Sequence, residues 1–317
     1  MGKYLITGFS GFVSSHFLTY LNNNTKANIL GIDLASPKFR LDYFKNIRCD
    51  FRQIDLLDIN QAKKLISGFQ PDYILHLASY SSVAFSWKNP ITSFMNNTNI
   101  FINLLEIVRE LNIKCRILSI GSSEEYGNVY VKELPLKESQ QLNPLNPYAV
   151  ARVAQEMMSK VYADGYGTDI IMTRSFNHIG PLQPDTYVVA SFARQLMEQK
   201  NLGCSKCKLI AGDVSIIRDF IDVRDVVEAY YKLFQKGRKG EVYNVCSGKG
   251  VKLKEVIEIM AHNMGIEVEI QTNRELIRPS DNKIIIGSNE KIIRETGFDI
   301  RYSLEQSLND MLFYKNS

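Results

Sequence analysis

The sequence contains no long apolar run. Nowhere do apolar residues continue for the roughly 18 positions that a membrane-spanning helix needs. Near the N-terminus, the apolar residues 4–6 run straight into a Gly/Ser turn, which is not typical of a signal peptide. A myristoylation motif is also missing, because Ile6 stands where Ser or Thr is required. We therefore expect a cytoplasmic protein without a membrane partner.

Cysteine and histidine are scarce. Five cysteines in 317 residues do not indicate a disulfide framework. Residues 204–207 form a single C-x-x-C, but a structural zinc site needs four ligands and none of the four histidines is near in sequence. We expect a polar loop there and no metal. The net charge of +4 is too small, and the basic residues too dispersed, for a nucleic-acid partner.

Short β-rich runs alternate with helical patterns through the first half of the chain. Apolar, β-branched runs predict strands at residues 4–7, 29–33, 73–77, 116–120 and 169–174. Helical periodicity predicts helices at residues 12–21, 59–67, 92–111 and 148–162. This alternation is typical of βαβ units, so the predicted fold class is α/β, with a Rossmann-type doubly wound parallel sheet.

The second half has a looser pattern. Loops rich in Pro, Gly and Asp alternate with short strands and three helices, at residues 222–235, 253–264 and 304–312. We interpret this part as a smaller α/β substrate-binding segment at the carboxyl edge of the sheet. The expected division is 1–174 for the dinucleotide-binding domain and 175–317 for the substrate-binding segment, partly interleaved with the first.

A glycine-rich turn joins the first predicted strand to the first predicted helix. Gly8 permits a tight turn, and Gly11 lets backbone N–H groups at the helix N-terminus approach a pyrophosphate, which the helix dipole favours. The turn, the strand and the helix together predict a dinucleotide site. Its predicted cofactor-binding residues are Gly8, Phe9, Ser10, Gly11 and Phe12.

Acidic residues follow the next two strands. Asp33 ends the second strand, where a carboxylate accepts hydrogen bonds from the adenosine ribose and repels a 2′-phosphate. This favours NAD(H) over NADP(H), although Lys38 and Arg40 follow closely and oppose that preference. Asp55 and Leu56, after the third strand, are placed to meet the adenine.

Polar side chains at the carboxyl ends of later strands suggest carbonyl reduction. Ser122 follows the strand at 116–120, and Tyr148 and Arg152 lie four apart on one helix, so they point the same way. Reduction of a ketone needs a proton donor beside the oxygen that gains charge. A tyrosine serves when a nearby cation makes it more acidic, and a serine hydroxyl holds the same oxygen.

With these motifs, the chain resembles the extended short-chain dehydrogenase/reductases that modify nucleotide sugars. Within that family it is most similar to the GDP-4-keto-6-deoxy-D-mannose reductases, which form GDP-rhamnose. The resemblance runs nearly from end to end. It is carried by the glycine turn and by residues 76–78, Asn97, 120–127, Tyr148, 173–181 and 218–247.

The resemblance implies further site residues and a homodimer. A GDP-sugar substrate is implied, with catalytic roles for Ser122, Tyr148, Arg152 and Glu124. The cofactor set gains Leu77, Ala78, Ser79, Asn97, Tyr148 and Arg152. The substrate set comprises Ser123, Asn177, Val188, Arg218, Asn244 and Arg278, with the two arginines and Asn177 on the diphosphate, since guanidinium groups bind phosphates in a bidentate way. Dimerisation implies a contact at Phe94, Met95, Ile100 and Phe101, which a protein core explains equally well.

Four positions depart from the family pattern. Arg152 replaces the lysine of the Tyr-x-x-x-Lys motif, Ser79 replaces an alanine, and Ile100-Phe101 replaces Gly-Thr. Arginine keeps the charge but is bulkier and planar. We therefore expect an NAD(P)H-dependent 4-ketoreductase and keep two alternatives. One is a GDP-sugar 4,6-dehydratase or 4-epimerase, and the other is a non-catalytic homologue that binds the cofactor.

Overall fold

A seven-stranded parallel sheet forms the centre of the molecule in this computed structural model, which describes residues 1–277 and 282–314. The strand order is β10-β6-β5-β4-β1-β2-β3, and every pairing is parallel. The strands are β1 (Gly2–Thr7), β2 (Ala27–Asp33), β3 (Arg48–Gln53), β4 (Tyr73–His76), β5 (Arg116–Ser122), β6 (Asp169–Ser175) and β10 (Val242–Val245). The predicted Rossmann-type sheet is confirmed.

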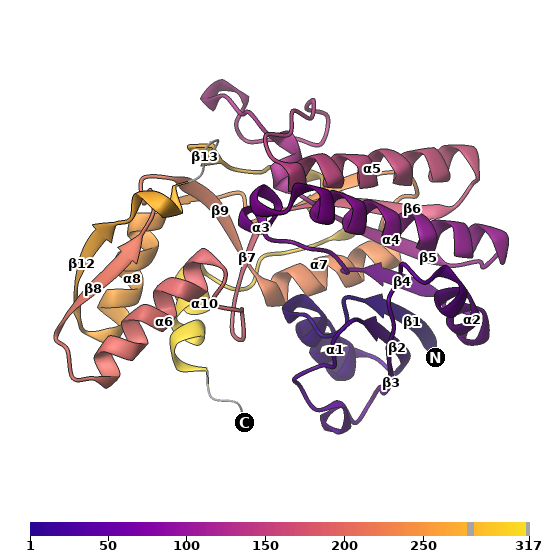
Figure 1. The fold of residues 1–317 in the computed structure, drawn as a ribbon, viewed down its shortest axis with the longest axis horizontal. Coiled ribbons are helices and arrows are strands. Elements are labelled where there is room, and N and C mark those ends of the chain that lie inside the picture. Colours follow the sequence, from indigo (N-terminus) through magenta and orange to yellow (C-terminus); the bar gives the residue numbers. More distant parts are fainter. Residues whose placement is uncertain (278–281, 315–317) are drawn as a thin grey trace.

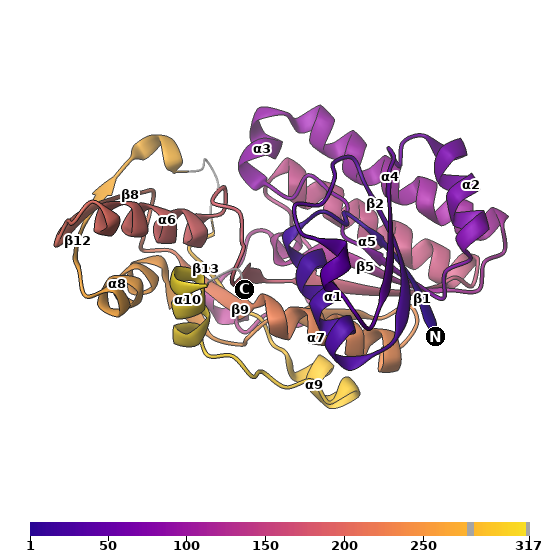
Figure 2. The same ribbon diagram turned by 90° about the horizontal axis from the view of Figure 1, so that it is seen from below.

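Helices cover both faces of this sheet (Figure 2). One face carries α2 (Ile59–Phe69), α3 (Val83–Lys88), α4 (Pro90–Glu110) and α5 (Pro147–Gly165), and the other carries α1 (Phe12–Asn24) and α7 (Val223–Lys236). The alternation in β1 explains this arrangement. Tyr4 and Ile6 join the core beneath α1 and α7, whereas Leu5 joins the core beneath α2 and α4. Both faces of the strand are therefore buried, as in other parallel sheets.

The carboxyl-terminal part builds a second, smaller lobe beside the sheet (Figure 1). Its strands are β7 (Asn177–Ile179), β8 (Lys206–Ala211), β9 (Ile217–Asp222), β11 (Gly250–Lys252), β12 (Glu267–Thr272) and β13 (Ile284–Ile285). Its helices are α6 (Val188–Asn201), α8 (Leu253–Met264) and α10 (Leu304–Phe313). Leu196, Leu209, Ile257 and Leu308 are fully buried in its own apolar core.

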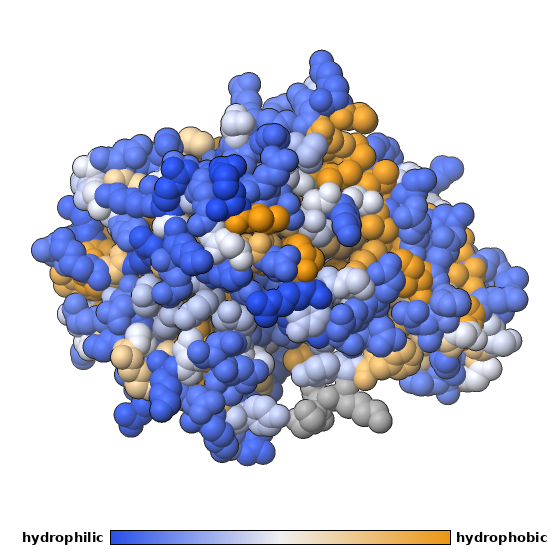
Figure 3. Space-filling view, turned by 180° about the vertical axis from the view of Figure 1, so that it is seen from behind, coloured by the Kyte–Doolittle hydropathy of each residue, from blue (hydrophilic) through white to orange (hydrophobic). Residues whose placement is uncertain are grey.

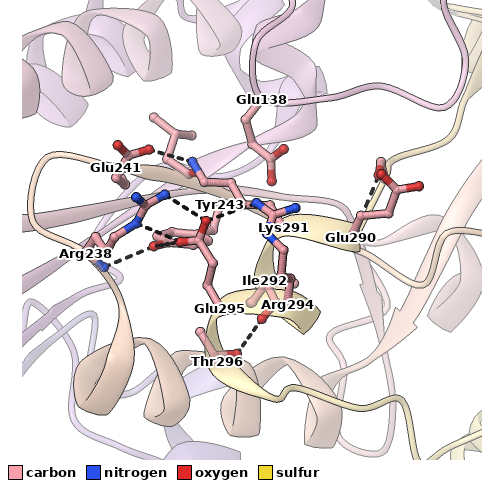
Figure 4. Close-up of polar contacts among 12 residues, drawn as sticks. Glu138, Arg238, Glu241, Tyr243, Glu290, Lys291, Ile292, Arg294, Glu295 and Thr296 are labelled. Carbon is pink, nitrogen blue, oxygen red and sulfur yellow. Dashed lines mark hydrogen bonds and ion pairs between the residues drawn. The ribbon is translucent and has the colours of Figure 1, made fainter.

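Helix α9 (Glu290–Thr296) is tied to β10, the edge strand of the main sheet (Figure 4). Lys291 donates to the Glu241 carboxylate at 2.7 Å and to a backbone carbonyl at 2.6 Å. The Tyr243 hydroxyl donates to Glu295 at 2.7 Å, and Arg238 pairs with the same carboxylate. These contacts link α9 to the main sheet, and Lys291 satisfies the Val242 carbonyl on its edge strand.

Helices α6 and α9 were not predicted from the sequence pattern, which indicated only three helices in the second half of the chain.

The surface seen from behind is mainly hydrophilic, and its larger apolar areas lie over the half that carries the smaller lobe (Figure 3). None of the helices in the described residues has the length and apolar character to cross a membrane.

Candidate active site

A cavity of about 570 Å³ lies at the carboxyl ends of the strands, between the sheet and the smaller lobe. The strand order reverses between β1 and β4, and such switch points are where ligands bind in open α/β sheets. Most of the predicted site residues line this cavity. They are Gly8, Gly11, Phe12, Asp33, Asp55, Leu56, Leu77, Ala78, Ser79, Ser122, Ser123, Glu124, Tyr148, Arg152, Asn177 and Val188.

The glycine turn packs directly against the chain that follows β4. Gly8 has a φ of +69°, and a Cβ there would lie 2.7 Å from the amide nitrogen of Ala78. Gly11 is the N-cap of α1, and because glycine has no side chain it makes no capping hydrogen bond to the first helical N–H groups. The first residues of α1, Phe12 to Ser14, line the cavity, and the N-terminus of a helix without a side-chain cap is suited to bind an anionic pyrophosphate. The turn therefore fits a dinucleotide.

Asp33 is held by backbone N–H groups at the end of β2. The N–H of Ser10 donates to one carboxylate oxygen at 2.8 Å, and the N–H of Leu34 donates to the other at 2.7 Å. Asp33 lines the cavity. Arg40, which was expected to oppose a preference for NAD(H), donates a 3.0 Å hydrogen bond from its Nε atom to Asp42.

Ser122 is fixed by a capping box at the end of β5. Its Oγ atom accepts a hydrogen bond from the N–H of Glu124, and its own N–H donates to Glu125 at 2.6 Å. Since Oγ is used here as an acceptor, the hydroxyl proton is free to point at a ligand. Glu124 also lines the cavity and accepts a hydrogen bond from the Asn146 amide at 2.9 Å.

Glu125, behind Ser122, is a fully buried carboxyl. Burial, followed by the nearby Glu156 carboxylate, raises the pKa of Glu125 well above its usual range. Glu156 forms a buried, two-point ion pair with Arg174, with contacts of 2.7 and 2.9 Å. Burial therefore favours the uncharged form of Glu125, which accepts the hydrogen bond from the backbone N–H of Ser122.

Tyr148 and Arg152 lie together near the start of α5. The guanidinium carbon of Arg152 is 5.1 Å from the centre of the Tyr148 ring, and both side chains are almost completely buried. Within the described part of the chain, no carboxylate pairs with Arg152; its recorded acceptors are the uncharged oxygens of Ser79, Ile120 and Gln155. A buried cation without a counter-ion favours a negative charge beside it.

Five predicted residues do not line the cavity. Phe9 points its ring into the core, where it stacks 5.7 Å from Phe51. The N–H of Ser10 donates to Asp33. The Asn97 amide oxygen accepts from the N–H of Tyr80 and its nitrogen donates to the Tyr80 carbonyl, so Asn97 supports the cavity wall from behind. Asn244 is fully buried in contacts with Tyr126, Leu136 and Ser288, and Arg218 donates to the carbonyls of Ile217 and Asn282. A sixth, Arg278, lies outside the described residues.

The structure also places residues at the cavity that the sequence did not single out. The Tyr187 hydroxyl, from the segment before α6, lies 2.7 Å from the Ser81 hydroxyl, which belongs to the loop after β4. His178 and Gln183 add further polar groups from the smaller lobe. Because Ser81 and Tyr187 are 106 positions apart, no local motif could have paired them.

Comparison with known proteins agrees with this geometry. The family model described as GDP-mannose 4,6-dehydratase matches residues 5–311. The chain belongs to this family. It is 33% identical to the GDP-6-deoxy-D-mannose reductase of Pseudomonas aeruginosa, over 98% of this chain and 96% of that protein.

Solved structures of the family share the fold. The structure of RMD from Pseudomonas aeruginosa complexed with NADPH has a TM-score of 0.85 and 31% identity, covering 98% of both chains. The Thermus thermophilus UDP-glucose 4-epimerase complexed with NAD has the same TM-score and 26% identity, covering 98% of this chain and 97% of that chain. The relatives of this chain are therefore nicotinamide-dependent enzymes of nucleotide sugars.

Proposed function

We propose that this protein reduces the 4-keto group of a GDP-4-keto-6-deoxy sugar, a hexose or a heptose, with NADPH or NADH. The observation that carries the proposal is the meeting of Ser122, Tyr148 and Arg152 in the cavity that also reaches the glycine turn. The 33% identity to a GDP-6-deoxy-D-mannose reductase supports the choice of substrate. In this proposal residues 1–174 mainly bind the cofactor and residues 175–317 mainly bind the sugar nucleotide.

Ser122, Tyr148 and Arg152 have different roles in the reduction of the ketone. A nicotinamide held beside the glycine turn would supply the hydride for carbon 4. The Ser122 hydroxyl donates a hydrogen bond to the ketone oxygen, and Tyr148 delivers a proton to that oxygen as charge develops on it. After the transfer Tyr148 is a phenolate. Arg152, which has no carboxylate partner in the described residues, stabilises this charge.

The sugar nucleotide is proposed to extend from this point into the smaller lobe. Asn177 lines the cavity from β7, and Val188 lines it from the first turn of α6. Asn177 is proposed to donate to a phosphate oxygen, and Arg278 to pair with the diphosphate. Arg218, which does not line the cavity, is proposed to add positive charge from behind this wall. Asn244, which is saturated by buried contacts, supports this wall and does not touch the ligand.

For the cofactor, we propose a preference for NADH. The Asp33 carboxylate is fixed at the end of β2, and a 2′-phosphate beside it would be repelled. Turnover with each cofactor under the same conditions tests this preference. A higher kcat/KM with NADPH would contradict it, and the NADPH in the Pseudomonas aeruginosa structure makes that comparison necessary.

A 4,6-dehydratase is the second candidate, because Glu124 supplies a carboxylate in the cavity. Dehydration needs a base for the proton on carbon 5, and Glu124 is the acidic side chain nearest in sequence to Ser122 that lines the wall. Spectroscopy separates the candidates. A reductase consumes NAD(P)H in equal amount to added GDP-4-keto-6-deoxymannose, whereas a dehydratase converts GDP-mannose without net cofactor change. Cofactor binding with neither reaction would identify a non-catalytic homologue.

We also propose a cytoplasmic homodimer that joins through α4 and α5. The predicted contact residues divide into two groups, since Ile100 and Phe101 are buried in the core while Phe94 and Met95 are exposed. Further exposed apolar side chains on these two helices are Ile91, Val150, Met157 and Val161. Sedimentation analysis of the wild type and of Val161→Glu tests the contact, because a buried charge at this interface converts a dimer to a monomer.

A further inference from the structure

Arg152 is fastened by two side chains as well as by a backbone carbonyl. Its Nη1 atom donates to the carbonyl of Ile120 at 3.0 Å and to the Gln155 amide oxygen at 2.6 Å, and its Nη2 atom donates to the Ser79 hydroxyl. Only 4% of the Arg152 surface is exposed. The guanidinium is therefore directed from two sides, by α5 and by the loop after β4.

Gln155 is itself held in one orientation. Its amide nitrogen donates to the Ser119 hydroxyl at 2.9 Å and to the Ile120 carbonyl at 3.1 Å. Ser159 donates to the Gln155 carbonyl at 2.9 Å, and its hydroxyl lies 3.1 Å from that of Ser119. Because the amide nitrogen is satisfied on the strand side, the amide oxygen faces Arg152. This hydrogen-bonded chain is buried throughout.

Each group that holds Arg152 is uncharged. A carboxylate in place of Ser79 or Gln155 would neutralise the guanidinium and weaken its effect on Tyr148. Other titratable groups also surround the pair: His76 on β4, Tyr187 before α6 and Tyr230 on α7. Burial, together with the Arg152 charge, lowers the pKa of His76 to about 3, so this ring is neutral and adds no second cation.

We propose that Ser79 and Gln155 are positioning residues that adapt the site to an arginine at position 152. Both act through Arg152, by holding a planar guanidinium where it keeps its full charge beside Tyr148. Two departures from the family pattern, Arg152 and Ser79, are in direct contact. A lysine has no second nitrogen to satisfy at this place, so it has no comparable need of the Ser79 hydroxyl. The inference rests on the proposed reductase function and names residues that this function requires.

The first test compares Ser79→Ala and Gln155→Met with the wild type over a range of pH. Tyr148 acts as an acid, so activity falls at high pH where the phenol has lost its proton. A cation that is less well placed makes the phenol a weaker acid. We expect kcat near neutral pH to fall about tenfold, equivalent to ~1.4 kcal/mol, while KM for the sugar nucleotide is unchanged. The alkaline fall in activity moves to higher pH.

A matched control removes a buried serine hydroxyl far from the site. Ser307→Ala on α10 loses a 2.9 Å hydrogen bond to a backbone carbonyl, so it reports a purely structural cost. We expect no change in its pH profile. If Ser79→Ala gives the same profile as Ser307→Ala and the wild type, the positioning role is wrong.

The second test is a double-mutant cycle between Ser79→Ala and Arg152→Lys. If Ser79 acts through the guanidinium, Ser79→Ala costs about tenfold in kcat with arginine present and less than twofold in the Arg152→Lys background. An equal cost in both backgrounds would overturn the proposal.

A readout without substrate keeps this test independent of the proposed reaction. The Tyr148 phenolate is titrated by difference absorbance against Tyr148→Phe, in each of the four proteins of the cycle. The proposal requires the phenolate to form at higher pH in Ser79→Ala, and an unchanged titration refutes it. If the wild type fails to reduce any GDP-4-keto-6-deoxy sugar but the titration shifts, the proposed function fails and the arrangement of Arg152 stands.

Discussion

The two ends of the cavity are built in different ways. At the cofactor end, Gly8 follows β1, Ser122 ends β5 and Tyr148 lies in the first turn of α5. Ser122 is fixed by the capping box of the turn that follows it, and Gly8 packs against the loop after β4. At the sugar end, β7, α6 and β9 meet through pairings and packing between distant segments. Residues close together in the chain therefore place Ser122 and Tyr148, although Arg152 is also held by Ser79 from the loop after β4. The shape of the sugar site depends on contacts between distant segments throughout.

The two ends also differ in how their polar groups are engaged. Ser122, Glu124 and Arg152 already have hydrogen-bond partners inside the protein. The Asn177 side chain, in contrast, lines the cavity without a recorded protein hydrogen bond among the described residues. We infer that the cofactor end is preorganised for chemistry and that the sugar end completes its contacts when ligand binds.

The largest expected effect lies at the cofactor end. Tyr148→Phe removes the proposed proton donor, so kcat for reduction should fall by about 10³-fold, within the usual range for a general acid. The affinity for NADPH should stay within twofold of the wild type, as measured by fluorescence titration. Tyr166→Phe, at an exposed tyrosine after α5, is the control and should keep full activity. Full activity in Tyr148→Phe would show that another group delivers the proton.

The second largest effect is expected at the glycine turn, where a substitution should lower the stability of the fold. Gly8→Ala places a Cβ atom 2.7 Å from the Ala78 nitrogen in a left-handed conformation, so we expect a loss of about 3 kcal/mol in the free energy of unfolding. Gly68→Ala on α2 is the matched control, because nothing lies within 4 Å of its Cβ and alanine favours a helix. It should stabilise by up to ~1 kcal/mol. Urea unfolding of both variants measures these changes. Similar free energies of unfolding would show that the glycine turn shifts to accommodate the Cβ atom.

Acid pH should weaken the cofactor end through His76. Its pKa is lowered to about 3 by burial and then by the Arg152 charge, while the unfolded ring titrates near its ordinary value. The folded state therefore binds fewer protons, so the stability from neutral His76 is present above pH ~6.5 and is lost as pH falls toward 3. Between pH 7 and 5 the loss is about 2 kcal/mol. His76→Gln should lose that much less over the same interval.

Asp219, in the smaller lobe, affects stability in the opposite direction with pH. Burial raises the pKa of Asp219, on β9, to about 6, so its contribution is present at low pH and is lost as pH rises through 6. The two effects partly cancel in the wild type. Only the difference between wild type and His76→Gln isolates the histidine. Equal losses in the two proteins would mean that His76 takes up its proton without opposing the fold.

The same contrast explains what the sequence could predict. Hydrophobic alternation and the turn signals around 7–14 and 120–127 indicated the sheet and the reacting groups, because these depend on residues close together in the chain. Helix α6 was missed since its N-cap, Tyr187, makes no side-chain cap and gives no start signal. Helix α9 has only seven residues, too few for a clear periodic pattern.

Individual roles were harder to predict than positions. Phe9 and Asn97 were predicted to contact the cofactor on the strength of motifs, but the first packs in the core and the second holds the Tyr80 backbone. A motif shows that a residue type suits the place, and it does not show which way the side chain turns. The Ser79–Arg152 contact, across 73 positions, likewise appears only once the loop after β4 meets α5 in the folded chain.

Asn177→Ala should give the smallest effect and divide the two ends most clearly. The amide is proposed to donate one hydrogen bond to a phosphate oxygen, and the loss of one bond to a charged acceptor costs about 1.4 kcal/mol, or tenfold in affinity. KM for the GDP-sugar should rise about tenfold, while NADPH affinity and the pH profile stay as in the wild type. Asn177→Asp should raise KM further, because a carboxylate repels the diphosphate. If instead NADPH affinity falls in Asn177→Ala and KM for the sugar does not change, Asn177 serves the cofactor, and the boundary between the two ends lies deeper in the smaller lobe.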